Sequence, residues 1–520
     1  CKASVDLFPS WVIARNAYPK RKPEVQLLCP SCGDIFRGVY GAKNVQCRSC
    51  AFEFSPEIGT AKGTQATCQL CHNTFSIMSA IAKEGHRPTF RLYGKLILTE
   101  NEEKEYLPVS PLDLASYQRC SALLEQEERE GLIALPRLEL EHGYNTKQAM
   151  SYGFKRWRDF FNNRQLLGLG WLNKAIADIA DQEVRDTLLT LFSGILEFNN
   201  MFASYKGEGT GAVRHMFAHH ILKPERAPIE ANIWGTSKSS GSFSNLFHSR
   251  LIRAVEYHLQ PTEVNGIATA KGVVYSRPFT GKVEPGLPAQ NGFLPRAIYL
   301  ACGDSSISNL PDQSIDLVVT DPPFFDNVHY SELADFFYAW QQLVPRGFIH
   351  TEQSTRSLSE VQDSDPQRFA AKLQVVFQDC NRVLKNEGLL VFTYHHSREE
   401  GWTSLAHAIL RAGFVVVNSH PVKAELSLAT PKSQTSEPIQ LDIILVCRKN
   451  SFARNNSTSV SRALEVAANK LCRLTSSGFT LSQNDQKIVK YGQLLTTLNS
   501  DEEVENLSEL MEQSSWKVMM

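Results

Sequence analysis

Along residues 286–450, short apolar runs alternate with amphipathic segments. The apolar runs cover residues 297–302, 315–319, 389–394, 414–418 and 441–447. Between the later runs, residues 373–383 and 402–412 repeat apolar side chains at the spacing of a helix that is buried on one side. Gly388 suits the C-terminal cap of the first of these helices. This alternation predicts an α/β fold with a mainly parallel sheet and crossover helices.

Outside this region the pattern differs. Residues 171–260 carry apolar positions at helical spacing, as in Leu188, Leu189, Phe192 and Ile195, and a loop rich in Ser and Gly interrupts them at 235–244. From residue 451 onward the chain is polar, with one helical patch at 463–474. We therefore expect a mainly helical insert before the α/β part and a peripheral tail after it.

Six of the twelve cysteines form three Cys-x-x-Cys pairs, which are Cys29/Cys32, Cys47/Cys50 and Cys68/Cys71. Paired thiolates on tight turns suit tetrahedral zinc, and a redox dithiol normally occurs once rather than three times in a row. The size of the chain and the lack of a signal peptide disfavour a disulfide scaffold. The spacing therefore predicts a zinc ribbon.

Six thiolates exceed one four-ligand site. Either one pair is spare, or His72 or His86 completes a second site. The remaining cysteines, Cys1 among them, are expected to be small core or incidental residues.

The apolar run at 315–319 leads directly into Asp321-Pro322-Pro323-Phe324. In open α/β sheets, ligands bind at the carboxyl ends of strands, which is where this motif falls. The Asp321 carboxylate and the Pro322 carbonyl can accept hydrogen bonds from an exocyclic amine, which frees the lone pair of its nitrogen. The two prolines stiffen the turn, and Phe324 offers a flat face for an extruded base. A strand-terminating turn is the alternative explanation of the same four residues.

The stretch 316–340 resembles the adenine-specific DNA methylases that contain a zinc ribbon. Four shorter pieces add to this resemblance: Arg382-Val383-Leu384-Lys385, Tyr394-His395-His396, Asn163-Arg164-Gln165-Leu166-Leu167 and Asn232-Ile233-Trp234-Gly235-Thr236. The resemblance covers residues 1–450 and implies a Rossmann-like methyltransferase sheet with an inserted zinc ribbon and a helical insert. It also implies S-adenosylmethionine as cofactor and adenine N6 in DNA as target, although spacing alone does not distinguish adenine N6 from cytosine N4.

The resemblance also indicates residues for the cofactor. In many S-adenosylmethionine-dependent methyltransferases, a strand followed by Gly-Asp-Ser places an acid against the adenine of the cofactor, and Gly303-Asp304-Ser305 matches this pattern. In the family, a strand ending in Asp-Leu-Asn-Pro contacts the ribose through its Asp. The match here is Asp6-Leu7-Phe8-Pro9, in which Phe8 replaces the usual Asn.

The glycine-rich loop that such a cofactor site needs does not follow a strand in this sequence. The segment Gly207-Glu208-Gly209-Thr210-Gly211 follows residues without strand character, and we expect a flexible polar loop there. We therefore expect an upstream segment or a partner subunit to carry the cofactor loop.

Charge limits the way in which DNA can be bound. Lys and Arg number 54 against 55 Asp and Glu, so the chain has no positive bulk field. DNA contact is expected at local patches such as 20–22 and 155–158. Residues 154–167 interleave aromatic and basic side chains, as a nucleic-acid face or an amphipathic helix would. No apolar run approaches the ~20 residues that span a bilayer, so we expect a cytoplasmic protein without a membrane partner.

Five segments follow from the patterns and the resemblance. They are the end of the cofactor-binding half (1–27), the zinc ribbon (28–90), a mainly helical insert suited to target recognition (91–285), the catalytic half (286–450) and the peripheral tail (451–520). The predicted function is methyl transfer from S-adenosylmethionine to an exocyclic amine in DNA, with adenine N6 favoured. The alternatives are cytosine N4, an amino group in RNA, and a catalytically inactive zinc-ribbon subunit that binds nucleic acid.

Overall fold

The structure is a computed structural model of the 520-residue chain. It describes residues 1, 3–101, 103–207, 213–218, 222–236, 239–260, 262–264, 273–275, 282–286, 293–295, 297–326, 328–344, 353–424, 439–453 and 458–513. Residues 208–211 of the glycine-rich segment therefore lie outside the described residues. The chain divides into two compact units, Cys1–Pro278 with Ser331–Arg356 and Phe279–Tyr330 with Ser357–Met520.

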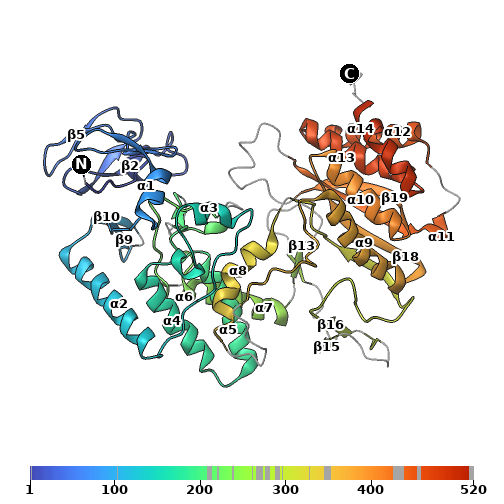
Figure 1. Ribbon diagram of the computed structural model, residues 1–520, viewed down its shortest axis with the longest axis horizontal. Helices are drawn as coiled ribbons and strands as arrows, with labels where there is room; N and C mark the ends of the chain where they lie inside the picture. The colour runs from blue at the N-terminus through green and yellow to red at the C-terminus, as the bar shows by residue number, and fades with distance from the viewer. Residues whose placement is uncertain are drawn as a thin grey trace. The chain divides into compact units, whose positions relative to one another are not determined.

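Small antiparallel sheets and one helix form the N-terminal part of the first unit (Figure 1). The strands pair as β1 (Val12–Arg15), β2 (Glu24–Leu28) and β3 (Ile35–Val39); β4 (Val45–Gln46) and β5 (Glu53–Phe54); β6 (Ala61–Lys62), β7 (Gln65–Thr67) and β8 (Thr74–Ser76); and β9 (Gly94–Leu98) and β10 (Lys104–Pro108). Helix α1 (Ile77–Glu84) follows β8 directly. The turns between these short strands carry the cysteine pairs.

Helices make up most of the remainder of the first unit. They are α2 (Pro111–Arg129), α3 (Thr146–Ser151), η1 (Trp157–Phe160), α4 (Asn163–Ala177), α5 (Gln182–Leu196), η2 (Met216–Ala218), α6 (Phe243–Leu246), the π-helix η3 (Phe247–Ile252), α7 (Arg253–Leu259) and α8 (Tyr330–Gln341). Two short hairpins, β11 (Ser204–Tyr205) with β12 (Val213–Arg214) and β13 (Thr262–Val264) with β14 (Val273–Tyr275), accompany them. A mainly helical region thus follows the small cysteine-rich sheets.

Buried aromatic rings form the core of these helices. Phe161 stacks on Phe336 at a ring-centroid distance of 5.7 Å and meets Trp340 edge-on at 5.5 Å. Phe336 and Trp340 belong to α8, which the sequence assigns to the catalytic half, whereas the structure packs this helix into the first unit. The prediction for this helix was wrong because its aromatic face is complementary to a core formed about 170 residues earlier in the sequence.

The second unit contains a mixed four-stranded sheet. Its strands are β17 (Ile315–Thr320), β18 (Leu384–Tyr394), β19 (Phe414–Lys423) and β20 (Leu441–Lys449), in the spatial order β17-β18-β20-β19. β17 pairs with β18 in parallel, whereas β20 runs antiparallel to both of its neighbours. A second, two-stranded sheet pairs β15 (Lys282–Pro285) with β16 (Ala297–Leu300) in parallel.

The predicted strand positions are therefore found, but a mainly parallel sheet is not what the described residues form. One helix boundary also differs from expectation. Gly388 lies inside β18 rather than capping a helix, because α9 ends at Val383 and the chain pairs with β17 from Leu384 onward. Glycine suits the position, since a side chain there would collide with Leu384 and with the backbone of Asp316. Since β18 and β20 bury every second residue, one face of the sheet is the packed face.

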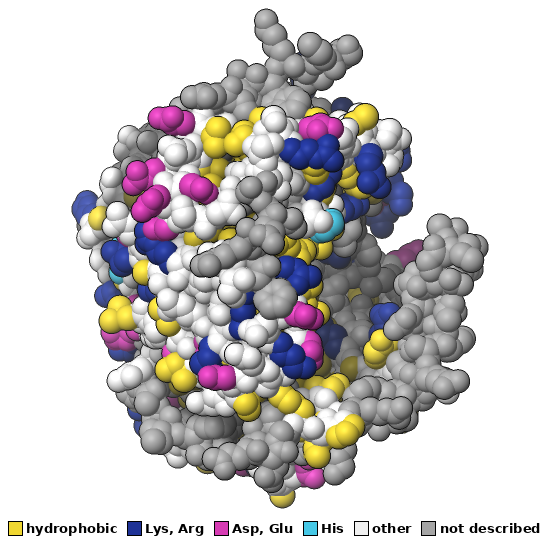
Figure 2. All heavy atoms as spheres, turned by 90° about the vertical axis from the view of Figure 1, so that its right-hand side faces the viewer, with side chains coloured by type: hydrophobic (Ala, Val, Ile, Leu, Met, Phe, Trp, Pro, Cys, Tyr) yellow, Lys and Arg dark blue, Asp and Glu magenta, His cyan; other side chains and the backbone are white. Residues whose placement is uncertain are grey.

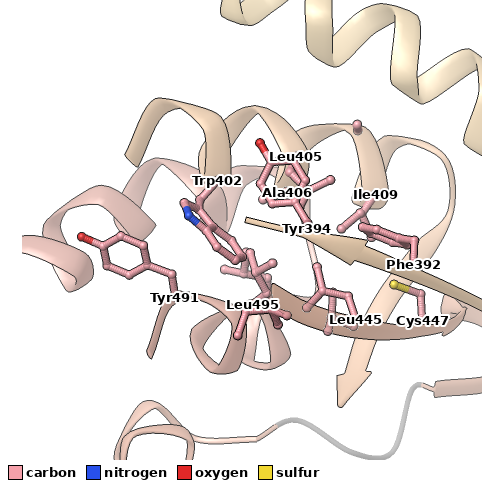
Figure 3. Packing of buried hydrophobic residues seen from close by; sticks show 14 of the residues in the cluster. Phe392, Tyr394, Trp402, Leu405, Ala406, Ile409, Leu445, Cys447, Tyr491 and Leu495 are labelled. Atoms are coloured by element: carbon pink, nitrogen blue, oxygen red, sulfur yellow. The ribbon is translucent and has the colours of Figure 1, made fainter. Parts of the chain in front are cut away.

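Helices cover this packed face. They are α9 (Pro366–Val383), α10 (Glu399–Arg411) and α13 (Gln483–Leu494), and the chain also contains α11 (Asn450–Ala453), α12 (Val460–Ser476), η5 (Leu495–Thr497), η6 (Asp501–Val504) and α14 (Glu505–Gln513). Figure 3 shows Tyr491 and Leu495 among Trp402, Tyr394 and Leu445. The prediction that residues 451–520 form a peripheral tail was therefore wrong, because α13 and the residues after it complete the core.

None of the helices in the described part of the chain is long and apolar enough to cross a membrane.

Candidate functional site

The three Cys-x-x-Cys pairs adopt one turn geometry. In each, the N–H of the first cysteine donates to the carbonyl five residues later, over 2.8 Å from Cys29 to Asp34, 2.9 Å from Cys47 to Phe52 and 3.0 Å from Cys68 to Asn73. In each, the carbonyl of the first cysteine also accepts from the N–H four residues later, which belongs to Gly33, Ala51 or His72. These three residues have φ values of 76°, 56° and 57°. The third pair is thus built as the first two are.

The first two pairs form a four-thiol cluster of Cys29, Cys32, Cys47 and Cys50, whose Sγ atoms all lie within 4.8 Å of one another. Two contacts across the cluster measure 3.6 Å (Cys29–Cys50) and 3.7 Å (Cys32–Cys47). A zinc ion with Zn–S bonds of about 2.3 Å sets its tetrahedral ligands about 3.8 Å apart, whereas a disulfide needs an S–S distance of about 2.05 Å. The spacing therefore fits a tetrahedral zinc ion and not a disulfide.

Backbone N–H groups in the turns favour the thiolate form of two cysteines. The N–H of Phe52 lowers the pKa of Cys50 to about 7. The N–H groups of Cys71 and Leu70 hold the pKa of Cys68 below its usual value. Burial raises the pKa of Cys29 in the same cluster, so the turns favour the thiolate, which is the metal-binding form, at Cys50 and Cys68 and not at every cysteine.

The third pair is joined by Cys1. Its Sγ lies 3.2 Å from Cys71 Sγ and 3.6 Å from Cys68 Sγ. From the sequence, Cys1 was expected to be incidental, and His72 or His86 was a candidate to complete a second zinc site. His72 holds the left-handed position of the turn, and His86 Nδ1 pairs with the Arg87 carbonyl at 2.8 Å. Neither histidine belongs to the thiol group that the described residues form.

Asp321 lies just beyond the carboxyl end of β17, with its side chain exposed. The hydroxyl of Thr393, at the carboxyl end of the parallel strand β18, donates to Asp321 Oδ1. Pro322 is buried and Pro323 is half-buried. Because parallel strands end at the same edge of a sheet, the motif and the end of β18 form one polar edge.

Phe324 is half-buried against the end of β18. Its ring lies 4.7 Å from the His395 ring and 5.4 Å from the Tyr394 ring, edge-on to both. His395 Nδ1 in turn pairs with Asp442 on β20. The rings behind Phe324 therefore fix its plane from two sides.

The residue after the motif has an unusual backbone. Phe325 has φ = 53° although it is not glycine, and its side chain is 1% exposed. Its ring packs edge-on against Phe369 and His396, each at 5.4 Å. Asp326, next along the chain, accepts from Arg398 and pairs with His396 Nε2 at 3.3 Å. Burial lowers the pKa of His396, which favours its neutral form.

The residues expected on the cofactor side fall into different units. Gly303, Asp304 and Ser305 are exposed in the loop after β16, in the second unit. The Ser306 hydroxyl donates to Asp304 Oδ1 at 2.6 Å, and this bond holds the pKa of Asp304 below its usual value. Asp6 belongs to the first unit, where both of its carboxylate oxygens accept from Arg91.

The first unit contains a cavity of about 1270 Å³. Asp6 and Arg91 line it, together with Arg164 and Trp234 from two of the segments that carry the family resemblance. Arg164 binds Glu230 through two hydrogen bonds of 2.7 and 2.9 Å. No residue of the Asp321–Phe324 motif is among the residues that line this cavity.

The two basic patches differ in their surroundings. Residues 20–22 are exposed in the turn between β1 and β2. In the patch at 155–158, Trp157 is fully buried and Arg158 forms a two-bond ion pair with Glu128 at 2.7 and 3.0 Å. The aromatic side chains of residues 154–167 lie in the core, which favours the amphipathic alternative over a nucleic-acid face.

Figure 2 shows the right-hand side of Figure 1, where Lys and Arg side chains gather toward the upper right and acidic side chains toward the upper left.

No protein-family model matches the chain, and no curated protein matches it.

Four residues at or next to the predicted sites were not found from the sequence: Cys1, Thr393, Phe325 and Asp442, the last of which binds His395. Cys1 could have been noticed as one more thiol beside an incomplete set of ligands. Thr393 and Asp442 carry no local signal, because the pairing of β18 with β17 and β20 brings them to the motif. The left-handed backbone of Phe325 is a matter of geometry, which a residue type alone does not indicate.

Proposed function

We propose that this chain carries the base-binding part of an amino-methyltransferase that acts on an exocyclic amine in DNA, with adenine N6 favoured. The position of Asp321-Pro322-Pro323-Phe324 carries the proposal. The motif follows a strand that pairs in parallel with β18, and the end of β18 supplies Thr393 and His395 to the same edge. A plain strand-terminating turn does not require these side-chain partners.

Asp321 and Pro322 are assigned to the amine. Thr393 binds Oδ1 of Asp321 and so fixes the plane of the carboxylate. Oδ2 and the Pro322 carbonyl would then accept the two N–H groups of the amine, which localises the lone pair on its nitrogen. The amine becomes acidic once it is methylated and can lose its proton to water, so the mechanism needs no general base.

Phe324 is assigned to the base. A flipped base costs a few kcal/mol to extrude, and stacking on an aromatic ring returns about 1–3 kcal/mol. Tyr394 and His395 hold the Phe324 ring edge-on, so the stacking surface is rigid before the base arrives.

S-adenosylmethionine, when bound, supplies the electrophilic methyl group. Asp304, with Gly303 and Ser305, is assigned to its adenine, and an exposed carboxylate fits that role. Asp6 is assigned to the ribose and fits less well, because it must first release Arg91. The proposal leaves the glycine-rich loop to an upstream segment or a partner subunit.

Zinc is assigned a structural role in the four-cysteine cluster, since four thiolates leave no coordination position for a substrate. The exposed basic turn at 20–22 precedes this ribbon and offers a local contact for DNA phosphates.

The test is methyl transfer by the full-length protein, with any partner subunit, from labelled S-adenosylmethionine to DNA. Asp321→Asn should lower kcat about 10²–10³-fold, as the loss of one preorganised polar contact does. Asp316→Asn is the matched control, because Asp316 is an exposed carboxylate on the same strand that pairs with Lys385. Equal incorporation by Asp321→Asn and by the unaltered protein would refute the mechanism.

The product identifies the target. N6-methyladenine supports the favoured target, and N4-methylcytosine or methylated RNA supports the same chemistry on the alternative substrates. DNA binding without any incorporation by the complete protein supports the inactive zinc-ribbon subunit.

A further inference from the structure

The third Cys-x-x-Cys turn has the geometry of a metal-binding turn. The other two pairs already form the four-cysteine cluster, so no further pair is left to share an ion with the third. Cys68 and Cys71 adopt the same backbone hydrogen bonds and the same left-handed fifth residue as the two pairs of the four-cysteine cluster. A turn with this geometry directs both thiols to one side, where they can share a cation.

Cys1 supplies a third thiol from a distant part of the chain. Its Sγ lies 3.2 Å from Cys71 and 3.6 Å from Cys68, although 70 and 67 residues separate them in the sequence. Both distances exceed the S–S bond of about 2.05 Å and approach the tetrahedral spacing of about 3.8 Å. The three Sγ atoms lie within 4.8 Å of one another, so one ion can contact them all.

Backbone hydrogen bonds of Phe8 and Pro9 fix the chain seven and eight residues after Cys1. The segment that follows it lies along residues 59–61: Gly59 N–H donates to the Pro9 carbonyl at 3.2 Å, and Ala61 N–H donates to the Phe8 carbonyl at 2.9 Å. The N–H of Phe8 also donates to Thr60 Oγ1 at 3.1 Å. The chain a few residues after Cys1 is therefore fixed beside the residues that lead into β6, β7 and the third turn.

We propose that Cys1, Cys68 and Cys71 bind a second zinc ion, with one coordination position left for a ligand outside these three thiolates. Cys1 and Cys71 are exposed and Cys68 is buried, so solvent or an added thiol can reach that position. Three protein ligands hold an ion less firmly than four. The second zinc therefore leaves before the ion of the four-cysteine cluster.

The second zinc has a structural consequence for Asp6. It links the beginning of the described chain to the third turn, and Asp6 lies between Cys1 and the backbone contacts of Phe8 and Pro9. Loss of the ion would release one end of this segment. As far as it concerns the ribose of the cofactor, this consequence rests on the proposed function; the metal site itself does not.

The experiment is zinc counting by mass spectrometry on the full-length protein, purified without chelators and under reducing conditions. We expect two zinc ions per chain. Cys1→Ser, Cys68→Ser and Cys71→Ser should each leave one, and Cys472→Ser, which changes an exposed cysteine outside both groups, should leave two. Two ions retained by Cys1→Ser, or a disulfide between Cys1 and Cys71 in the reduced protein, would overturn the proposal.

Cobalt substitution gives a second measurement if a serine variant still holds metal weakly. The visible absorption of Co²⁺ should show one site with four thiolates and one with three. Cys1→Ser should change only the second site, and an unchanged spectrum would overturn the assignment of Cys1. Hydrogen exchange in residues 3–9 should accelerate about tenfold or more in Cys1→Ser, since local opening sets that rate. These readouts do not depend on methyl transfer, so the failure of either proposal can be recognised separately.

Discussion

Replacing Phe325 tests whether the turn after Asp321–Phe324 is strained. Phe325 combines a left-handed backbone, φ = 53°, with a side chain that is 1% exposed. Truncation to alanine removes the ring packed against Phe369 and His396, which should cost about 3–5 kcal/mol. Alanine keeps the left-handed strain of about 1–2 kcal/mol, whereas glycine does not.

The comparison of alanine with glycine isolates this strain. In ordinary backbone, glycine is about 0.5–1 kcal/mol less stable than alanine. At position 325 the relief of strain offsets that loss, so Phe325→Gly should be equal to Phe325→Ala or up to about 1.5 kcal/mol more stable. Phe377 is the matched control, because it is 1% exposed in the same core but lies in α9. There glycine should be about 1 kcal/mol less stable than alanine.

Hydrogen exchange of β18 and β20 across a urea series measures the free energy of unfolding of the second unit for all four variants. If glycine is less stable than alanine by the same margin at 325 and at 377, the strain is absent and the reasoning is refuted. A strained turn also orients Phe324, so Phe325→Gly should slow methyl transfer more than its stability alone predicts.

Three further predictions concern other parts of the structure. Burial lowers the pKa of His396 in the folded state. As the pH falls, the unfolded chain therefore binds this proton first, near pH 6.5, and the free energy of unfolding decreases below that pH. His396→Gln should make the free energy of unfolding depend less on pH between 7.5 and 5.5, and an unchanged slope would contradict this. Glu332→Ala removes the acceptor of the Tyr144 and Asn145 N–H groups, at 2.9 and 2.6 Å, and should cost the first unit about 2–6 kcal/mol in urea unfolding, with Glu332→Gln milder. Chelation of zinc, or Cys50→Ser, should raise the rate of hydrogen exchange across residues 24–54 and leave the rate in β18 unchanged, because zinc binding is coupled to folding of the segment that holds the four cysteines. Equal protection of residues 24–54 with and without metal would contradict this prediction.

The positions of the strands and helices in the second unit could be predicted from periodicity, because burial on one face leaves a regular pattern. The direction of β20 could not, since Leu441–Lys449 is apolar in the same way whether it runs parallel or antiparallel. The connection from β19 to β20 did contain evidence for the antiparallel direction. Residues 424–440 contain Pro431 and Pro438 and no helical pattern, and a parallel crossover usually needs a helix.

The three Cys-x-x-Cys turns were predictable, and the residues that join them were not. A Cys-x-x-Cys pair is a local feature, so the sequence identified all three turns, whereas the approach of Cys1 depends on backbone pairing across more than fifty residues. The aromatic residues of 154–167 show the same limit. Their pattern fits a binding face or a core equally well, and only the position of α8 decides between them.

The chain leaves the first unit after Pro278 and returns to it at Ser331, so α8 completes a core whose other members were synthesised much earlier. During translation, Phe161 and Phe192 lack their ring partners Phe336 and Trp340 until the segment with the Asp-Pro-Pro-Phe motif and α8 have been synthesised. Domains generally fold as units at the ribosome, at about 5–20 residues per second, and exposed aromatic surface invites aggregation during such a delay. A chain released near residue 330 would leave this aromatic surface uncovered.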